Sequence, residues 1–201
     1  MKEMMGSVEN KESTEFTTTE APVAVDPPDG FRAGDAFSKG RIITPGTRAQ
    51  LGAFGLFAPQ PSQRQVLLPT TKPLNVKSAE DVLWVAFAEL CGWPASAEDY
   101  RELAKEHRTW VIDGVPSPTH ESAAGSAAAW ERFRDVVDVL YEQDITLFLI
   151  GNGPLDWNIA QDPAHKTNAR PEDLSRIASR VSLLSRVESF EPFDEIEISG
   201  S

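Results

Sequence analysis

The sequence contains little cysteine and no long apolar run, and these absences exclude several classes of protein. Its 201 residues include one cysteine, Cys91, which cannot form a disulfide framework or a structural zinc site within the chain and favours a reducing compartment. The longest apolar run, residues 145–151, is interrupted by Thr146 and is too short to cross a bilayer. Residues 1–10 carry no apolar segment of the secretory type. We therefore expect a cytoplasmic protein with no integral membrane segment.

Basic charge is also scarce. The chain has 31 acidic residues against 19 basic ones, a formal net charge of -12. A field of this sign repels the phosphate backbone of nucleic acids and anionic membrane surfaces. We expect no nucleic-acid partner.

The two ends of the chain differ in composition from its middle. Residues 1–40 are polar and acidic with several prolines, which predicts a disordered leader. Residues 41–78 are interrupted by prolines and predict only short strands and loops, at 41–44 and 65–68. Residues 191–201 predict an acidic tail or an edge strand.

Between these ends, residues 79–190 predict an α/β body. Three apolar runs, at 82–87, 109–113 and 145–150, are typical of strands that are buried on both faces. Amphipathic helices are expected between and after them, the first with Ser96 as its N-cap, the others at 127–141 and 171–184. This alternation predicts a mainly parallel sheet with flanking helices.

No phosphate-binding loop of the form G-x-x-x-x-G-K-[ST] occurs in the chain. Gly151 and Gly153 follow a predicted strand, but Pro154 removes an N–H donor where a phosphate would need one. Asp113 ends an apolar strand as a Walker B aspartate does, but Gly114 stands where a second acid is usual. We expect Asp113 to cap the turn that follows it.

The candidates for nucleophilic or metal chemistry are Cys91, His107, His120 and His165. No G-x-S-x-G motif and no metal-ligand spacing accompanies them, so a structural role is expected for each. His107 lies at a helix end, where a positive charge would complement the dipole. Two arginines on predicted helices, Arg132 and Arg180, could each pair with a carboxylate or face an anion in a cleft.

Several segments, taken in order, resemble the ZapE-like ATPases, the ATPase-family-gene-one type of P-loop ATPase. The resemblance begins with FAELCGWP at residues 87–94 and AEDY at 97–100. It continues over the body through the following segments: WVIDGVP at 110–116, RF at 132–133, VDVLYE at 137–142, LFLI at 147–150, PL at 154–155 and ASRVSLL at 178–184.

The resemblance implies a P-loop-NTPase-like fold that binds and hydrolyses ATP with Mg²⁺ and works on protein partners at the cell-division machinery. The family's phosphate loop, Walker B strand and sensor asparagine lie upstream of the matching region and are absent here. Ala86 and Glu131 also replace a family aspartate and arginine. Arg180 corresponds to the family's S-R pair, which implies a sensor-type arginine facing nucleotide phosphates.

Three hypotheses follow, of which the last, an unrelated small hydrolase, lacks a nucleophile–base pair that can be named. The first is a truncated or split ZapE-like ATPase, inactive alone and without a cofactor of its own, which pairs with a complementary N-terminal half. The second is a non-enzymatic α/β scaffold for protein interaction. A truncated sheet would also expose an apolar edge strand, which predicts self-association or instability unless something covers it.

Overall fold

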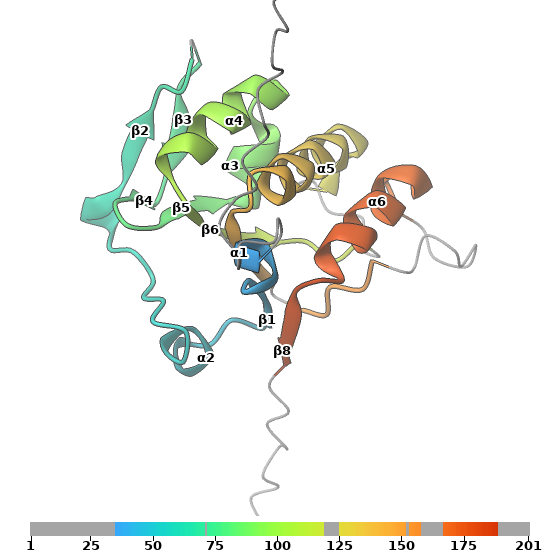
Figure 1. Cartoon of the computed structure of the whole chain (residues 1–201), viewed down its shortest axis with the longest axis horizontal. Helices are drawn as coiled ribbons and strands as arrows, with labels where there is room; N and C mark the ends of the chain where they lie inside the picture. The colour runs from blue at the N-terminus through green and yellow to red at the C-terminus, as the bar shows by residue number, and fades with distance from the viewer. Residues whose placement is uncertain (1–34, 71, 119–124, 152, 158–166, 189–201) are drawn as a thin grey trace, which may run out of the picture. The chain divides into compact units, whose positions relative to one another are not determined.

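The computed structural model describes residues 35–70, 72–118, 125–151, 153–157 and 167–188, all within one compact unit that spans Arg32–Ser201 (Figure 1). The elements follow in the order α1 (Asp35–Ser38), β1 (Arg41–Thr44), α2 (Arg48–Gly52), the 3-10 helix η1 (Pro61–Gln63), β2 (Gln65–Leu67), β3 (Leu74–Val76), β4 (Ser78–Ala79), β5 (Leu83–Ala86), α3 (Phe87–Gly92), α4 (Ala97–Glu106), β6 (Thr109–Val115), α5 (Ala127–Glu142), β7 (Thr146–Gly151), α6 (Pro171–Val181) and β8 (Ser185–Glu188).

The main sheet has six strands in the order β4-β5-β6-β7-β1-β8. Every neighbouring pair is parallel except β4 with β5, so the predicted α/β class with a mainly parallel sheet is confirmed. The first strand, β1, lies inside this sheet between β7 and β8. Strands β2 and β3 form a separate antiparallel hairpin.

Side chains on the two faces of the sheet enter two separate cores. On one face, residues such as Ile42, Ile112 and Leu149 pack against apolar side chains of α3, α4, α5 and α6. On the other, Trp84 and Phe148 and their neighbours pack against residues of α2 and of the segment after it. Among the described elements, the second face is therefore covered by much less helix than the first (Figure 1).

The predicted leader extends too far toward the body, because residues 35–40 are ordered. Phe37 of α1 is fully buried. The Asp144 carboxylate accepts hydrogen bonds from the amides of Ala36 (2.9 Å) and Phe37 (3.0 Å), which satisfies the first turn of this short helix. The rest of the predicted leader, residues 1–34, lies outside the described residues, as does the predicted tail at 191–201.

The local signals of the predicted body correspond closely to the structure. Ser96 caps α4 in a capping box with Asp99, as the spacing predicts. The three buried strands and the helices α5 and α6 also form where they are expected. The sequence does not predict α3, which begins at Phe87, the last residue of the apolar run that indicates a continuous strand.

The prediction of an apolar edge strand in this sheet is wrong. Among the described residues, the edges are β4, which has two residues, and β8, where Ser185, Arg186 and Glu188 are exposed. The sheet does not end at one of its apolar strands because β1 and β8 extend it beyond β7. Short, charged edges disfavour pairing with another chain.

Candidate functional site

The carboxyl end of β1 is where an open parallel sheet would bind a ligand. In such folds ligands bind at the carboxyl ends of the strands, at the point where the strand order reverses. Here β1 has β7 on one side and the last strand, β8, on the other. The turn of Pro45 and Gly46 connects β1 to α2, in the position that a phosphate loop would take.

This turn requires glycine and is closely packed. Gly46 has φ of +82°, a conformation that favours glycine. A Cβ atom there would lie 2.4 Å from Cγ2 of Ile150 on β7, so a larger residue would clash.

The side chain of Gln50 fills the space that the turn encloses. Its Oε1 accepts hydrogen bonds from the amides of Gly46 (3.0 Å) and Thr47 (2.8 Å). The Oγ1 atom of Thr47 accepts in return from the amide of Gln50 (3.2 Å), which completes a capping box at the start of α2. The Gln50 Nε2 group donates to the carbonyl oxygens of Thr44 (2.9 Å) and Val187 (3.5 Å). Gln50 is buried and bridges the carboxyl ends of β1 and β8.

A phosphate loop uses free backbone N–H groups and a lysine to hold phosphate oxygens. In this turn two of those N–H groups are already bonded to Gln50, and the first turn of α2 carries Arg48 and Ala49 in place of a lysine. The residues at this position therefore do not fit an ATP phosphate group. The T-x-x-Q spacing of Thr47 and Gln50 was a readable capping signal that the sequence reasoning missed.

Asp113 does not cap the turn after its strand, so that prediction is wrong. Its Oδ2 atom accepts hydrogen bonds from Nζ of Lys77 (2.5 Å) and from Nε1 of the buried Trp84 (2.6 Å). The Lys77 contact is also an ion pair, with the aspartate side chain 16% exposed. Asp113 thus holds the indole and the ammonium group in place on the thinly covered face of the sheet. Within the described part of the chain, no group of three or more His, Cys, Asp or Glu residues is placed to hold a metal ion.

Arg180 packs between helices α5 and α6. Its Nε group donates to Oδ1 of Asp138 at 3.3 Å, and its guanidinium lies 4.1 Å from the ring centre of Tyr141. Nε of Arg176 forms an ion pair with the other oxygen of Asp138 at 2.5 Å. Arg180 is at the carboxyl end of α6, which leads into the start of β8, so it lies toward the amino ends of β1 and β8, whereas the β1 turn lies at the carboxyl ends. Its role as a sensor arginine stays a prediction that needs a nucleotide bound near the amino ends of these strands.

The remaining candidates have structural surroundings. Arg132 donates to the carbonyl oxygen of Cys91 at 2.9 Å, near the end of α3. Burial raises the pKa of the Cys91 thiol far above its usual range, so the reactive thiolate is disfavoured. Burial also lowers the pKa of His107, which disfavours the charged form that would complement the helix dipole. His120 and His165 lie outside the described residues.

None of the described helices is long and apolar enough to cross a membrane. No solved structure matches the chain. The uncharacterized protein C115.02c of Schizosaccharomyces pombe is 29% identical over 92 residues, a match that covers 46% of this chain and 18% of the yeast protein. Residues 46–189, well over half of the chain, match the family model described as AFG1-like ATPase. The chain therefore belongs to the AFG1-like ATPase family of P-loop NTPases.

Proposed function

We propose that this chain is a non-hydrolysing α/β module of the AFG1-like ATPase family that acts by binding a protein partner. The observation that carries the proposal is the bonding of the Gly46 and Thr47 amides to Gln50. Phosphoryl transfer depends on positioning and on neutralising phosphate charge. A turn whose amides are bonded to a buried side chain, with Arg48 in place of the usual lysine, does not supply that positioning.

The test is a calorimetric titration of the full chain with Mg-ATP. We expect no binding heat at nucleotide concentrations up to about 1 mM, where a dissociation constant of that size would correspond to a binding free energy of about −4 kcal/mol. A dissociation constant in the micromolar range would contradict the proposal. A Gln50→Ala variant, checked for folding by circular dichroism, tests the reason. If this variant gains weak affinity for ATP while the unaltered chain has none, the Gln50 side chain is what prevents the turn from binding phosphate.

Family membership supports a second candidate, in which the chain completes an ATPase whose phosphate loop lies on another polypeptide. In that assembly Arg180 would face the nucleotide phosphates, and ATP and Mg²⁺ would be bound by the other half. Mixing this chain with a phosphate-loop fragment of the family should then give ATP turnover that Arg180→Ala reduces. Arg101→Ala, which removes an exposed arginine on α4, is the matched control. Equal turnover for both variants would remove the role of Arg180.

We also infer a cytoplasmic location and a partner in the cell-division machinery, the work that resemblance to the ZapE-like proteins implies. A fluorescent fusion to the full chain tests both inferences. We expect it to be enriched at the division site of dividing cells. A fusion that stays evenly distributed through division would contradict the division partner, and a secreted fusion would contradict the location.

A further inference from the structure

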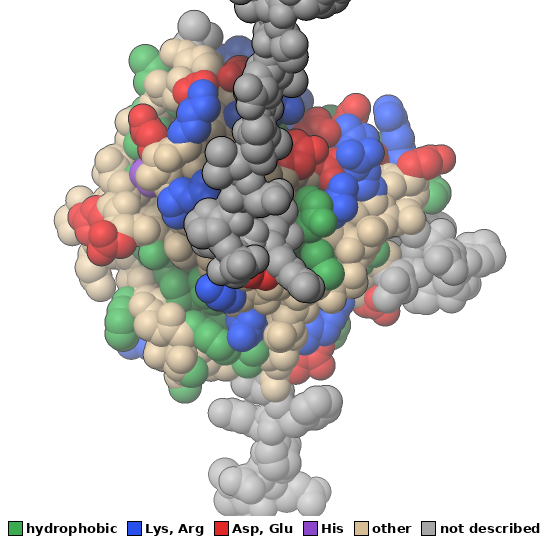
Figure 2. Space-filling view, viewed as in Figure 1, with side chains coloured by type: hydrophobic (Ala, Val, Ile, Leu, Met, Phe, Trp, Pro, Cys, Tyr) green, Lys and Arg blue, Asp and Glu red, His purple; other side chains and the backbone are tan. Residues whose placement is uncertain are grey.

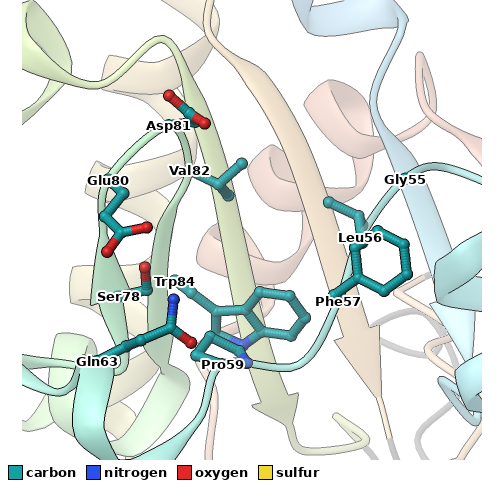
Figure 3. A pocket seen from close by; sticks show the side chains of 10 residues that line it. All are labelled: Gly55, Leu56, Phe57, Pro59, Gln63, Ser78, Glu80, Asp81, Val82 and Trp84. Atoms are coloured by element: carbon teal, nitrogen blue, oxygen red, sulfur yellow. The ribbon is translucent and has the colours of Figure 1, made fainter.

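A hollow of about 220 Å³ lies between the segment after α2 and the turn that joins β4 to β5 (Figure 3). Glu80 and Ser78 line one side of it, Phe57 lies on the other, and the indole of Trp84 lies between them. Sites for cofactors and other drug-sized molecules usually have about 300–1,000 Å³. The hollow therefore suits one long side chain better than a nucleotide.

The apolar part of this surface combines the indole of Trp84, which is 4% exposed and held in place, with an exposed phenyl ring, Phe57. The hydrogen bond from Nε1 of Trp84 to Asp113 fixes the orientation of the indole at one wall of the hollow. Phe57 is 79% exposed, the highest value among the exposed large hydrophobic side chains of the described residues. A wider hollow of about 600 Å³ lies against Phe57 and is lined by Leu51 and Arg48. Hydrophobic side chains also gather on this face where Figure 1 places α2 (Figure 2). Such exposed apolar surface is typical of protein interaction sites.

The polar part of the hollow is acidic and lacks partners. Glu80 and Asp81 are exposed, and neither forms an ion pair with another described residue. Ser78 is 7% exposed and lines the hollow, yet within the described residues its hydroxyl group has no hydrogen-bond partner. The nearby ammonium group of Lys77 is engaged by Asp113.

Carboxylates beside an aromatic face attract a cation, both by charge and through the π-system of the ring. A hydroxyl without a partner adds an acceptor for the N–H groups of that cation. We propose that this hollow binds a lysine or arginine side chain of a protein partner, and that an apolar residue next to it in the partner covers Phe57. The proposal rests on the interaction role proposed above and names the chemistry of the partner.

The experiment titrates the ¹⁵N-labelled full chain with the blocked tripeptide acetyl-Leu-Arg-Leu-amide and follows amide chemical shifts. We expect shifts confined to residues 55–63 and 78–84, and none with acetyl-Leu-Glu-Leu-amide. The double variant Glu80→Lys, Asp81→Lys should weaken the affinity by about tenfold, since two attractive charges become repulsive. Phe57→Ala should weaken it by about threefold to tenfold through lost apolar contact.

The matched control is Glu142→Lys, which reverses an exposed charge on α5, on the opposite face of the sheet. It should leave peptide affinity unchanged. The proposal is overturned if the arginine peptide shifts no residue of the hollow, if the glutamate peptide binds equally, or if Glu142→Lys weakens binding as much as the double variant. Free arginine amide binding as tightly as the tripeptide would point to a small cation and would also overturn it. None of these results bears on the Mg-ATP titration, which tests the non-hydrolysing role separately.

Discussion

The contacts of Asp113 lead to a prediction that distinguishes two roles of this residue, stabilising the fold and binding a metal ion. The Asp113→Ala change removes the acceptor of the Trp84 indole N–H and the partner of Lys77. Trp84 is buried, and a buried donor left without a partner costs about 1–3 kcal/mol. With the lost ion pair, we expect Asp113→Ala to lower the free energy of unfolding by about 2–3 kcal/mol.

Replacing the ion-pair partner of Asp113, by Lys77→Met, should lower the free energy of unfolding much less. The Lys77 side chain is 39% exposed, and exposed ion pairs contribute about 0–1 kcal/mol. Asp113 keeps its indole donor in this variant. The expected asymmetry, a large loss for Asp113→Ala and a small one for Lys77→Met, follows from the difference in burial between the two donors.

Urea unfolding followed by far-ultraviolet circular dichroism measures both variants against the unaltered chain. A second measurement compares melting temperatures with and without Mg²⁺, and we expect no magnesium-dependent shift in any of the three proteins. The reasoning would be refuted if Asp113→Ala were as stable as the unaltered chain. A rise in melting temperature with Mg²⁺ that disappears in Asp113→Ala would also refute it, because it would identify the carboxylate as a metal ligand.

Three further predictions concern stability and are measured by urea unfolding. Desolvation raises the pKa of Asp99, but hydrogen bonds from Ser96 and from Thr70 lower it more, so the pKa lies below its ordinary value. Asp99→Ala should therefore lower the free energy of unfolding by about 1–2 kcal/mol at pH 7. This difference between the variant and the unaltered chain should shrink as the pH falls below about 4, through the folded-state pKa of Asp99. A difference that does not change with pH would contradict this reasoning. Phe37→Ala should cost about 3–5 kcal/mol because its ring is fully buried, and a cost below about 1 kcal/mol would mean that α1 is not anchored. Arg180→Met should cost no more than about 1 kcal/mol, since Asp138 keeps Arg176 as a partner; a cost above about 3 kcal/mol would contradict that sharing.

The features that the sequence predicted correctly are those determined by neighbouring residues. The capping box of Ser96 and Asp99 needs a spacing of three residues, and the strand at 109–113 is apolar along its length. Family resemblance was visible for the same reason, because its landmarks are short segments in order. These signals sufficed for the α/β class and for the family.

The features that were missed depend on residues far apart in the chain. β1 has four residues and reads as an isolated short strand, and only its pairing with β7 and β8 places it inside the sheet. The partners of Asp113 come from β5 and from the residue before β4, which spacing along the chain does not indicate. The capping box of Thr47 and Gln50 is local and readable from the spacing, whereas the bond from Gln50 to Val187 depends on the position of β8.

The bridge that Gln50 forms has a consequence for how the chain folds. Its Nε2 group contacts the carbonyl oxygen of Val187, 137 residues later in the chain. β1 cannot pair until β7 has been synthesised, its second partner β8 comes later still, and contacts of such large sequence separation slow folding. During synthesis the strand that carries the apolar side chains of Ile42 and Ile43 therefore has no partner strand. The bonds of the turn itself are local, but its link to β8 is among the last contacts to form, and any fragment that ends before β8 should lack that link.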